Sequence, residues 1–79
     1  MKYNTEKVDE ATLALMWLVT QNDKSGSRAW KNFDWATLDR LHEKGLISDP
    51  KSKAKSVALS EEALELSKAL FNKLFGGAV

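Results

Sequence analysis

Three side chains that can bind phosphate or read a base lie at helical spacing in the middle of the chain. Thr37, Arg40 and Lys44 are separated by three and four residues, which places them on one face of the helix expected there. On that face Arg40 suits a bidentate contact to guanine, and the other two suit contacts to phosphate. The alternative is an ordinary solvated helix face, with Lys44 near the negative end of the helix dipole.

A second basic group follows in a segment whose composition predicts a turn. Residues 48–54 are rich in turn formers and contain Pro50, which does not fit a central strand. Lys51, Lys53 and Lys55 alternate here and suit contacts to phosphates, with binding that weakens as salt rises. Charged hairpin tips also serve solubility alone. Double-stranded DNA is therefore a candidate partner, with these lysines and the three helix residues as candidate contacts.

Two tryptophans flank the start of the same helix. Trp30 and Trp35 stand near Arg28 and Lys31, and aromatic rings on a basic strip can stack on unpaired bases. Aromatic residues beside a helix start in a small protein are more often core residues or part of a hydrophobic staple. We expect this second role, with Trp35 buried.

No group of residues points to catalysis or to a bound cofactor. His42 is the single histidine and the chain has no cysteine, so no metal site is expected. The chain has no phosphate-binding glycine loop, no dinucleotide-binding turn and no nucleophile elbow. We expect a binding protein rather than an enzyme, with no cofactor and no small-molecule substrate.

Composition and charge are typical of one small globular domain, residues 1–79. The chain is 43% hydrophobic and 29% charged, and it has no long apolar run. Its net charge is +1, but residues 24–55 carry eight basic residues against four acidic ones, a net +4, and the remainder carries −3. Such an asymmetry steers a polyanion to one part of the surface. Without cysteine or an apolar N-terminal segment, a cytoplasmic location is expected.

Polar caps and glycines mark where three helices begin and end. Asn4 or Thr5 can cap the first helix, and Asp34 and Ser60 can cap the others. Gly45 suits the left-handed position that follows the second helix. The predicted helices run from the first cap to about Gln21, from Trp35 to Lys44, and from Glu61 to the Gly76-Gly77 pair.

Between the second and third helices the pattern is that of two short strands. Leu46 and Ile47 begin the first, and in the second Val57 and Leu59 alternate inward. We expect these strands to form a hairpin, and residues 28–33 to form at most one helical turn. The predicted fold class is α+β, mainly helical and winged-helix-like, with three helices and a two-stranded β-hairpin between the second and third.

The first helix is apolar on two faces, which a helix exposed on one side does not need. One face holds Val8, Ala11, Leu15, Leu18 and Val19. The other holds Leu13, Met16 and Trp17. In so small a chain we expect a second subunit to cover one of them. The predicted interface of this homodimer consists of Met16, Trp17, Phe71 and Phe75.

The run from Leu38 to Leu66 has the form LxxLxxKGLI, basic turn, KSVxLSEEAxEL. It resembles winged-helix regulators of the MarR and PadR type, and the resemblance implies that the second helix and the basic turn face DNA. Those regulators have a full helix before the recognition helix, for which only residues 27–33 are available here. Asp39 and Glu43 also weaken the positive field on the outer surface of the second helix.

The whole chain is also similar to a family of short bacterial proteins of unknown function. The likeness rests on RAWK at 28–31, FDW at 33–35 and GLISDP at 45–50, and it implies no activity. We therefore expect a nucleic-acid-binding or regulatory module. The competing hypothesis is a protein–protein interaction module with the same fold and no DNA binding.

Overall fold

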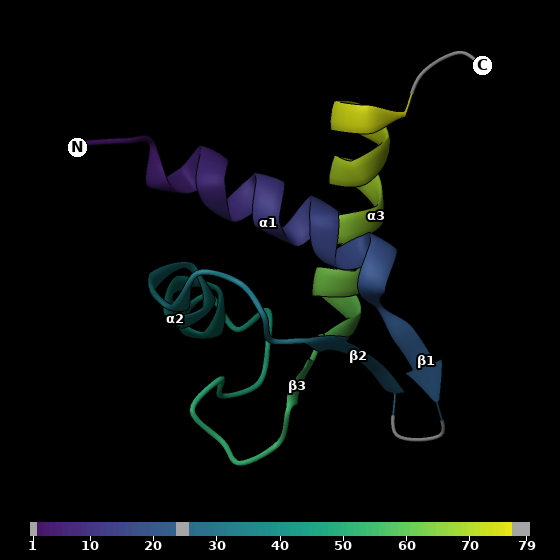
Figure 1. Cartoon of the computed structure of the whole chain (residues 1–79). Helices are drawn as coiled ribbons and strands as arrows, with labels where there is room; N and C mark the ends of the chain where they lie inside the picture. Colours follow the sequence, from purple (N-terminus) through teal and green to yellow (C-terminus); the bar gives the residue numbers. More distant parts are fainter. Residues whose placement is uncertain (1, 24–25, 77–79) are drawn as a thin grey trace.

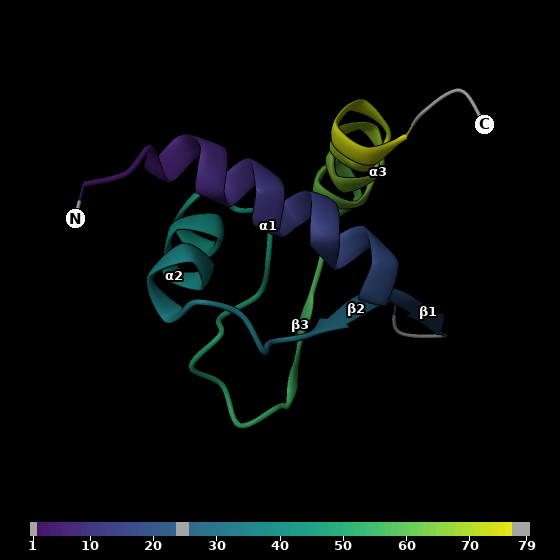
Figure 2. The same ribbon diagram turned by 45° about the horizontal axis from the view of Figure 1, so that its top comes forward.

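Three helices and three short strands make up the part of the chain that the computed structural model describes, residues 2–23 and 26–76. In chain order they are α1 (Thr5–Val19), β1 (Gln21–Asp23), β2 (Gly26–Trp30), α2 (Trp35–Glu43), β3 (Ser56–Ala58) and α3 (Glu61–Phe75). The helix α1 crosses the molecule, with α2 beside its N-terminal half and α3 beside its C-terminal half (Figures 1 and 2). The predicted class, α+β and mainly helical with three helices, is confirmed. Lys24 and Gly77, both used in the sequence predictions, lie outside the described residues.

Each helix begins at a polar cap that the sequence indicates. The side chains of the capping residues accept hydrogen bonds from backbone N–H groups three positions further on, at 3.1 Å for Asn4, 3.1 Å for Asp34 and 3.0 Å for Ser60. These bonds satisfy donors that the first helical turn leaves free. The predicted helix starts are therefore confirmed, with Asn4 rather than Thr5 as the first cap.

The helix ends follow from local backbone geometry. The first helix stops at Val19, before the predicted Gln21, because Thr20 is extended with ψ at 131°. The hydroxyl of Thr20 donates to the carbonyl of Met16 at 2.6 Å. Gly45 follows α2 with φ at 77°, and its N–H donates to the carbonyl of His42 at 2.9 Å. The left-handed glycine predicted there is confirmed.

The strand β2 is the central strand of an antiparallel sheet in the order β1-β2-β3. Arg28 pairs with Gln21 on one side, and Ala29 pairs with Val57 on the other. The sequence allowed at most one helical turn in residues 28–33, but residues 28–30 belong to a strand. Their backbone groups pair with strands, an arrangement that no helical turn offers.

The hairpin predicted between α2 and α3 is present in a short form. Ile47 forms an isolated antiparallel bridge with Leu59. Next to it, the N–H of Ser48 donates to the carbonyl of Ala58 at 2.9 Å. Because β3 also pairs with β2, this hairpin joins a larger sheet than the sequence predicts. Residues 49–55 connect its two sides as a loop.

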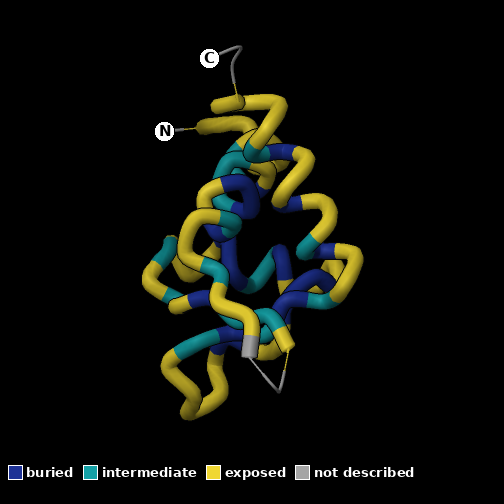
Figure 3. The backbone as a smooth tube through the Cα atoms, turned by 90° about the vertical axis from the view of Figure 1, so that its right-hand side faces the viewer, coloured by how far each residue is buried: buried dark blue, intermediate teal, exposed yellow. Residues whose placement is uncertain are grey.

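The buried hydrophobic residues form one cluster, with members from all three described helices and from β2 and β3. Figure 3 marks the buried stretches of the backbone in dark blue. Val57 and Leu59 point into this cluster as predicted. Trp35 was predicted to be buried but is 55% exposed. Leu38 and Leu41 occupy the inward face of α2, and Trp35 lies outside that face. Among the helices described, none is long and apolar enough to cross a membrane.

Candidate nucleic-acid interface

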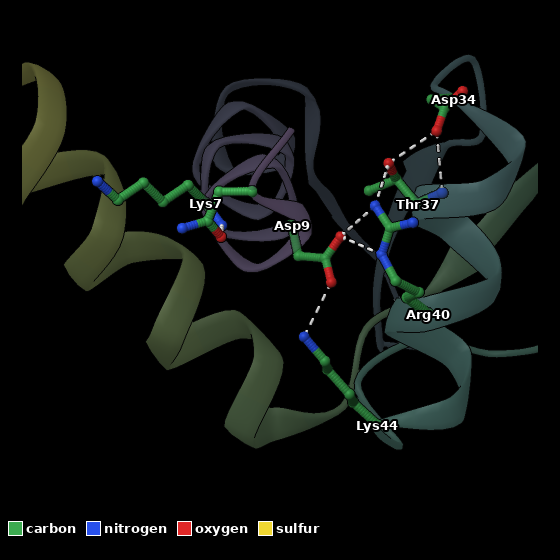
Figure 4. A network of polar contacts seen from close by, with 7 residues as sticks. Lys7, Asp9, Asp34, Thr37, Arg40 and Lys44 are labelled. Atoms are coloured by element: carbon green, nitrogen blue, oxygen red, sulfur yellow. Dashed lines mark hydrogen bonds and ion pairs between the residues drawn. The ribbon is translucent and has the colours of Figure 1, made fainter. Parts of the chain in front are cut away.

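The Arg40 and Lys44 side chains of α2 extend toward Asp9 of α1 (Figure 4). Arg40 donates from Nε to the Oδ1 of Asp9 at 2.8 Å, and its Nη2 lies 2.7 Å from the same oxygen. Lys44 Nζ donates to the other carboxylate oxygen at 2.9 Å. The two cations predicted to meet DNA are therefore paired with one carboxylate of α1.

Thr37 is part of the same network and is completely buried. Its hydroxyl donates to the Oδ2 of Asp34 at 2.9 Å and accepts from the Nη2 of Arg40 at 3.0 Å. This burial leaves no surface for the phosphate contact predicted for Thr37. The three residues share a face, as their spacing indicates, but that face packs against α1.

The ion pairs of Asp9 shift the pKa values of Asp9 and Arg40. Burial by itself raises the pKa of Asp9, but hydrogen bonds and charge from Arg40 and Lys44 outweigh it, so the pKa lies below its ordinary value. The hydrogen bond to Asp9 in turn raises the pKa of Arg40. Asp9 and Arg40 are therefore ionised at neutral pH, and Arg40 and Lys44 are both paired with the Asp9 carboxylate.

The lysines of the loop are placed differently. Lys51, Lys53 and Lys55 are all exposed. The loop that carries them is anchored by Lys31, whose Nζ donates to the carbonyls of Pro50 and Ser52 at 2.7 Å each. Pro50 is itself buried. The three loop lysines are thus held on a fixed part of the surface beside the end of β2.

Both tryptophans near this loop are exposed. Ala29 points into the core, so Arg28 and Trp30, on either side of it, emerge on the opposite face of the sheet. Trp30 is 55% exposed and borders a hollow of about 490 Å³ with Val19, Asn32 and Phe33. The expected core or staple role for Trp30 and Trp35 is therefore wrong. Phe33 packs against the core instead.

Arg28 and Lys31 complete a group of cations around the loop. Arg28 donates from Nε to the hydroxyl of Ser56 at 2.8 Å and from Nη2 to its carbonyl at 3.0 Å. Lys31 Nζ lies 5.9 Å from the ring centre of Trp35. We call these five cations the basic surface: Arg28, Lys31, Lys51, Lys53 and Lys55.

The four residues predicted for the homodimer interface are not equally accessible. Met16 is fully buried in the core, so its predicted interface role is wrong. Trp17 is half-buried beneath Lys68, and Phe71 packs against the core. Phe75 is 52% exposed, and its ring lies 5.3 Å from that of Phe71. The more exposed apolar face of α1 is the other one, which carries Leu15, Leu18 and Val19.

His42 has a local structural contact. Its Nδ1 lies 3.0 Å from the carbonyl of Ile47, where the chain leaves α2. In the described ranges 2–23 and 26–76, no three acidic or histidine side chains are grouped to hold a metal ion.

Over the residues that the structure describes, fold and surface define a small α+β protein in which three helices share one core with a three-stranded antiparallel sheet that has a basic loop at its edge. The chain belongs to the family described as Domain of unknown function (DUF6429), whose model matches residues 4–77. It is 52% identical over 75 residues to the uncharacterized protein y4hR of Sinorhizobium fredii (strain NBRC 101917 / NGR234). That match covers 95% of this chain and 97% of the relative. No solved structure matches the chain.

These findings confirm the resemblance to a short bacterial family of unknown function. The matching family model is not that of a winged-helix regulator.

Proposed function

We propose that this protein binds nucleic acid through its basic surface. The observation that carries the proposal is the anchored loop with three exposed lysines. A loop held by Lys31 presents its charges in a fixed arrangement, and phosphate contacts then cost little additional ordering of the chain. A cytoplasmic location is part of this proposal.

The proposal differs from the usual winged-helix arrangement in the element that meets the ligand. The loop between Ile47 and β3 has the place that the wing has in the regulators the chain resembles. The second helix contributes less, because Arg40 and Lys44 are paired with Asp9. Its outer side carries Asp39 and Glu43, which oppose a polyanion.

Charge reversal tests the proposal. Titration with labelled nucleic acid at about 50 mM salt should detect binding by the natural chain. The triple variant Lys51→Glu, Lys53→Glu, Lys55→Glu should bind at least about tenfold more weakly. Its fold should remain, because these side chains are exposed.

The matched control is an equal charge change elsewhere, Lys2→Glu, Lys7→Glu, Lys73→Glu. These lysines are also exposed and lie near the two ends of the chain. The start of α1 and the end of α3 lie away from the loop of residues 49–55 (Figure 1). Equal loss of binding in both triple variants would indicate attraction by overall charge alone. That result would contradict a role for the basic surface.

A specific observation favours a second function, protein–protein interaction through a homodimer. On α1, Leu15, Leu18 and Val19 are 42%, 64% and 41% exposed. No charged residue lies between Ala11 and Asn22. An uncharged apolar face can meet its own copy across a two-fold axis without placing like charges together. The dimer interface is thus proposed on this face.

A further inference from the structure

We propose that the nucleic acid bound by the basic surface is single-stranded, with Trp30 and Trp35 stacking on its bases. This inference rests on the proposed nucleic-acid binding and adds the form of the ligand. Three features of the structure support it: the exposure of the two rings, the cations beside them, and the orientation of α2.

The two rings are exposed for identifiable reasons. In β2 the buried Ala29 sends its neighbour Trp30 to the outer face of the sheet. Trp35 is the first residue of α2, and it is exposed although Leu38 and Leu41 further along the helix are buried. Each of the two residues is 55% exposed. The third tryptophan, Trp17, is less accessible and has Lys68 over its ring.

Cations lie beside both rings. Lys31 follows Trp30 in sequence, and its Nζ lies 5.9 Å from the ring centre of Trp35. Lys55 lines a small hollow together with Trp30 and Arg28. The same Lys31 holds the loop of Lys51 and Lys53 by two hydrogen bonds. Alternating aromatic rings and cations are what proteins use to bind unpaired bases and the phosphates between them.

Two carboxylates near the basic surface accept hydrogen bonds from residues of their own turns. Asp34 accepts hydrogen bonds from the backbone N–H and hydroxyl of Thr37. Asp49 accepts from the backbone N–H of Lys51 at 2.9 Å. Both carboxylates therefore serve as caps within their own turns.

Duplex recognition has less support from the same geometry. A helix that reads the major groove must present donors to base edges, and the donors of α2 point toward Asp9 instead. In a duplex the bases already stack on one another, so exposed indoles gain little there. Unpaired bases are free to stack on them.

The inference is tested by fluorescence titration of the natural chain at about 50 mM salt with three labelled probes of equal length. The probes are oligothymidylate, oligouridylate and a mixed-sequence DNA duplex. Both single strands should bind at least about fivefold more tightly than the duplex and should quench tryptophan emission. The two single-stranded probes also show whether the protein prefers DNA or RNA.

Replacing each tryptophan tests the contribution of base stacking to binding separately from that of charge. Trp30→Ala and Trp35→Ala should each weaken single-strand binding by at least about fivefold, with little change in duplex binding. The matched control is Leu74→Ala, which alters an exposed apolar residue of α3 and should leave binding unchanged. Thermal unfolding followed by circular dichroism verifies that each variant is folded.

The outcomes distinguish this inference from the proposed function. Duplex binding equal to single-strand binding, with unchanged affinity in both tryptophan variants, would overturn the single-strand inference and leave the basic surface as a duplex contact. Binding of none of the three probes would overturn both proposals. That result would favour the protein–protein interaction module.

Discussion

At the scale of single residues, Asp9 links α1 to α2. Its side chain is only 3% exposed, yet it is charged. A carboxylate in such a place is tolerated when it is paired and hydrogen-bonded. Arg40 and Lys44 provide both the opposite charge and the hydrogen bonds. Arg40 Nη2 lies 2.7 Å from one carboxylate oxygen of Asp9, and Lys44 Nζ lies 2.9 Å from the other.

We predict that Asp9→Asn lowers the free energy of unfolding by about 1 to 3 kcal/mol at pH 7, because it weakens two charge-assisted hydrogen bonds. Urea denaturation measures the loss. The matched control is Glu10→Gln, which alters an exposed carboxylate on the same helix. Equal losses in the two variants would mean that Asp9 does not link the helices.

The same carboxylate makes the stability depend on pH. The pKa of Asp9 lies below its ordinary value of 3.8, so the folded chain binds this proton less readily than the unfolded chain. The stabilisation by Asp9 is therefore complete at pH values above its ordinary pKa. It is lost as the pH falls through the lowered pKa of the folded chain. Between about pH 5 and about pH 2, the unfolding free energy of the natural chain should fall more steeply than that of Asp9→Asn. Parallel profiles would contradict this.

At the scale of elements, Gly45 determines where α2 stops and the chain turns toward Ile47. Its φ is 77°, and a Cβ placed there would meet no atom within 4 Å. The cost of a substitution is therefore conformational rather than steric crowding. Gly45→Val should lower the unfolding free energy by about 1 to 2 kcal/mol, and Gly45→Asn by less, because asparagine tolerates this backbone region. Urea denaturation measures both, and equal losses would contradict the conformational explanation.

Local signals predicted the helices well because caps and the terminal glycine act within a few residues. The strands β1 and β2 could not be predicted in this way. Residues 21–23 read Gln-Asn-Asp, which have no preference for strands, and they pair through contacts with residues 26–28. The third strand adds partners almost thirty residues away, such as Val57 with Ala29. Such pairing is a property of the tertiary structure.

The sequence predicted only part of the candidate site, because the direction in which a helix face points also depends on the tertiary structure. Spacing places Thr37, Arg40 and Lys44 on one face of a helix, but it does not say which way that face points. Asp9 indicates the direction of this face, because it lies four residues before the buried Leu13 and therefore on the buried side of α1. A carboxylate on a buried face needs basic partners. The loop lysines lack such a partner in the sequence pattern, and they are exposed.

At the scale of the whole molecule, α1 has one apolar face in the core and one at the surface. The exposed face carries Leu15, Leu18 and Val19, next to the hollow bordered by Trp30 and Phe33. Contiguous apolar surface of this kind is typical of association sites. It differs from the predicted interface, since Met16 lies in the core.

We predict that sedimentation at micromolar concentration shows a dimer of the 8.8 kDa chain. Leu18→Glu should convert it to the monomer, because it places two like charges near the two-fold axis. Leu66→Glu, which alters an exposed leucine of α3, is the matched control and should remain dimeric. A monomeric natural chain, or equal effects of the two variants, would contradict this interface.

The most direct test of the basic surface is the salt dependence of nucleic-acid binding. If Lys51, Lys53 and Lys55 each contact a phosphate of a single strand, together they contribute a slope of about −2 to the plot of log K against log salt concentration. The Lys51→Gln, Lys53→Gln, Lys55→Gln variant should bind more weakly, with a slope shallower by about that amount. An unchanged slope in this variant would contradict the account, as would an absence of binding by the natural chain at about 50 mM salt and a protein concentration near 10⁻⁴ M.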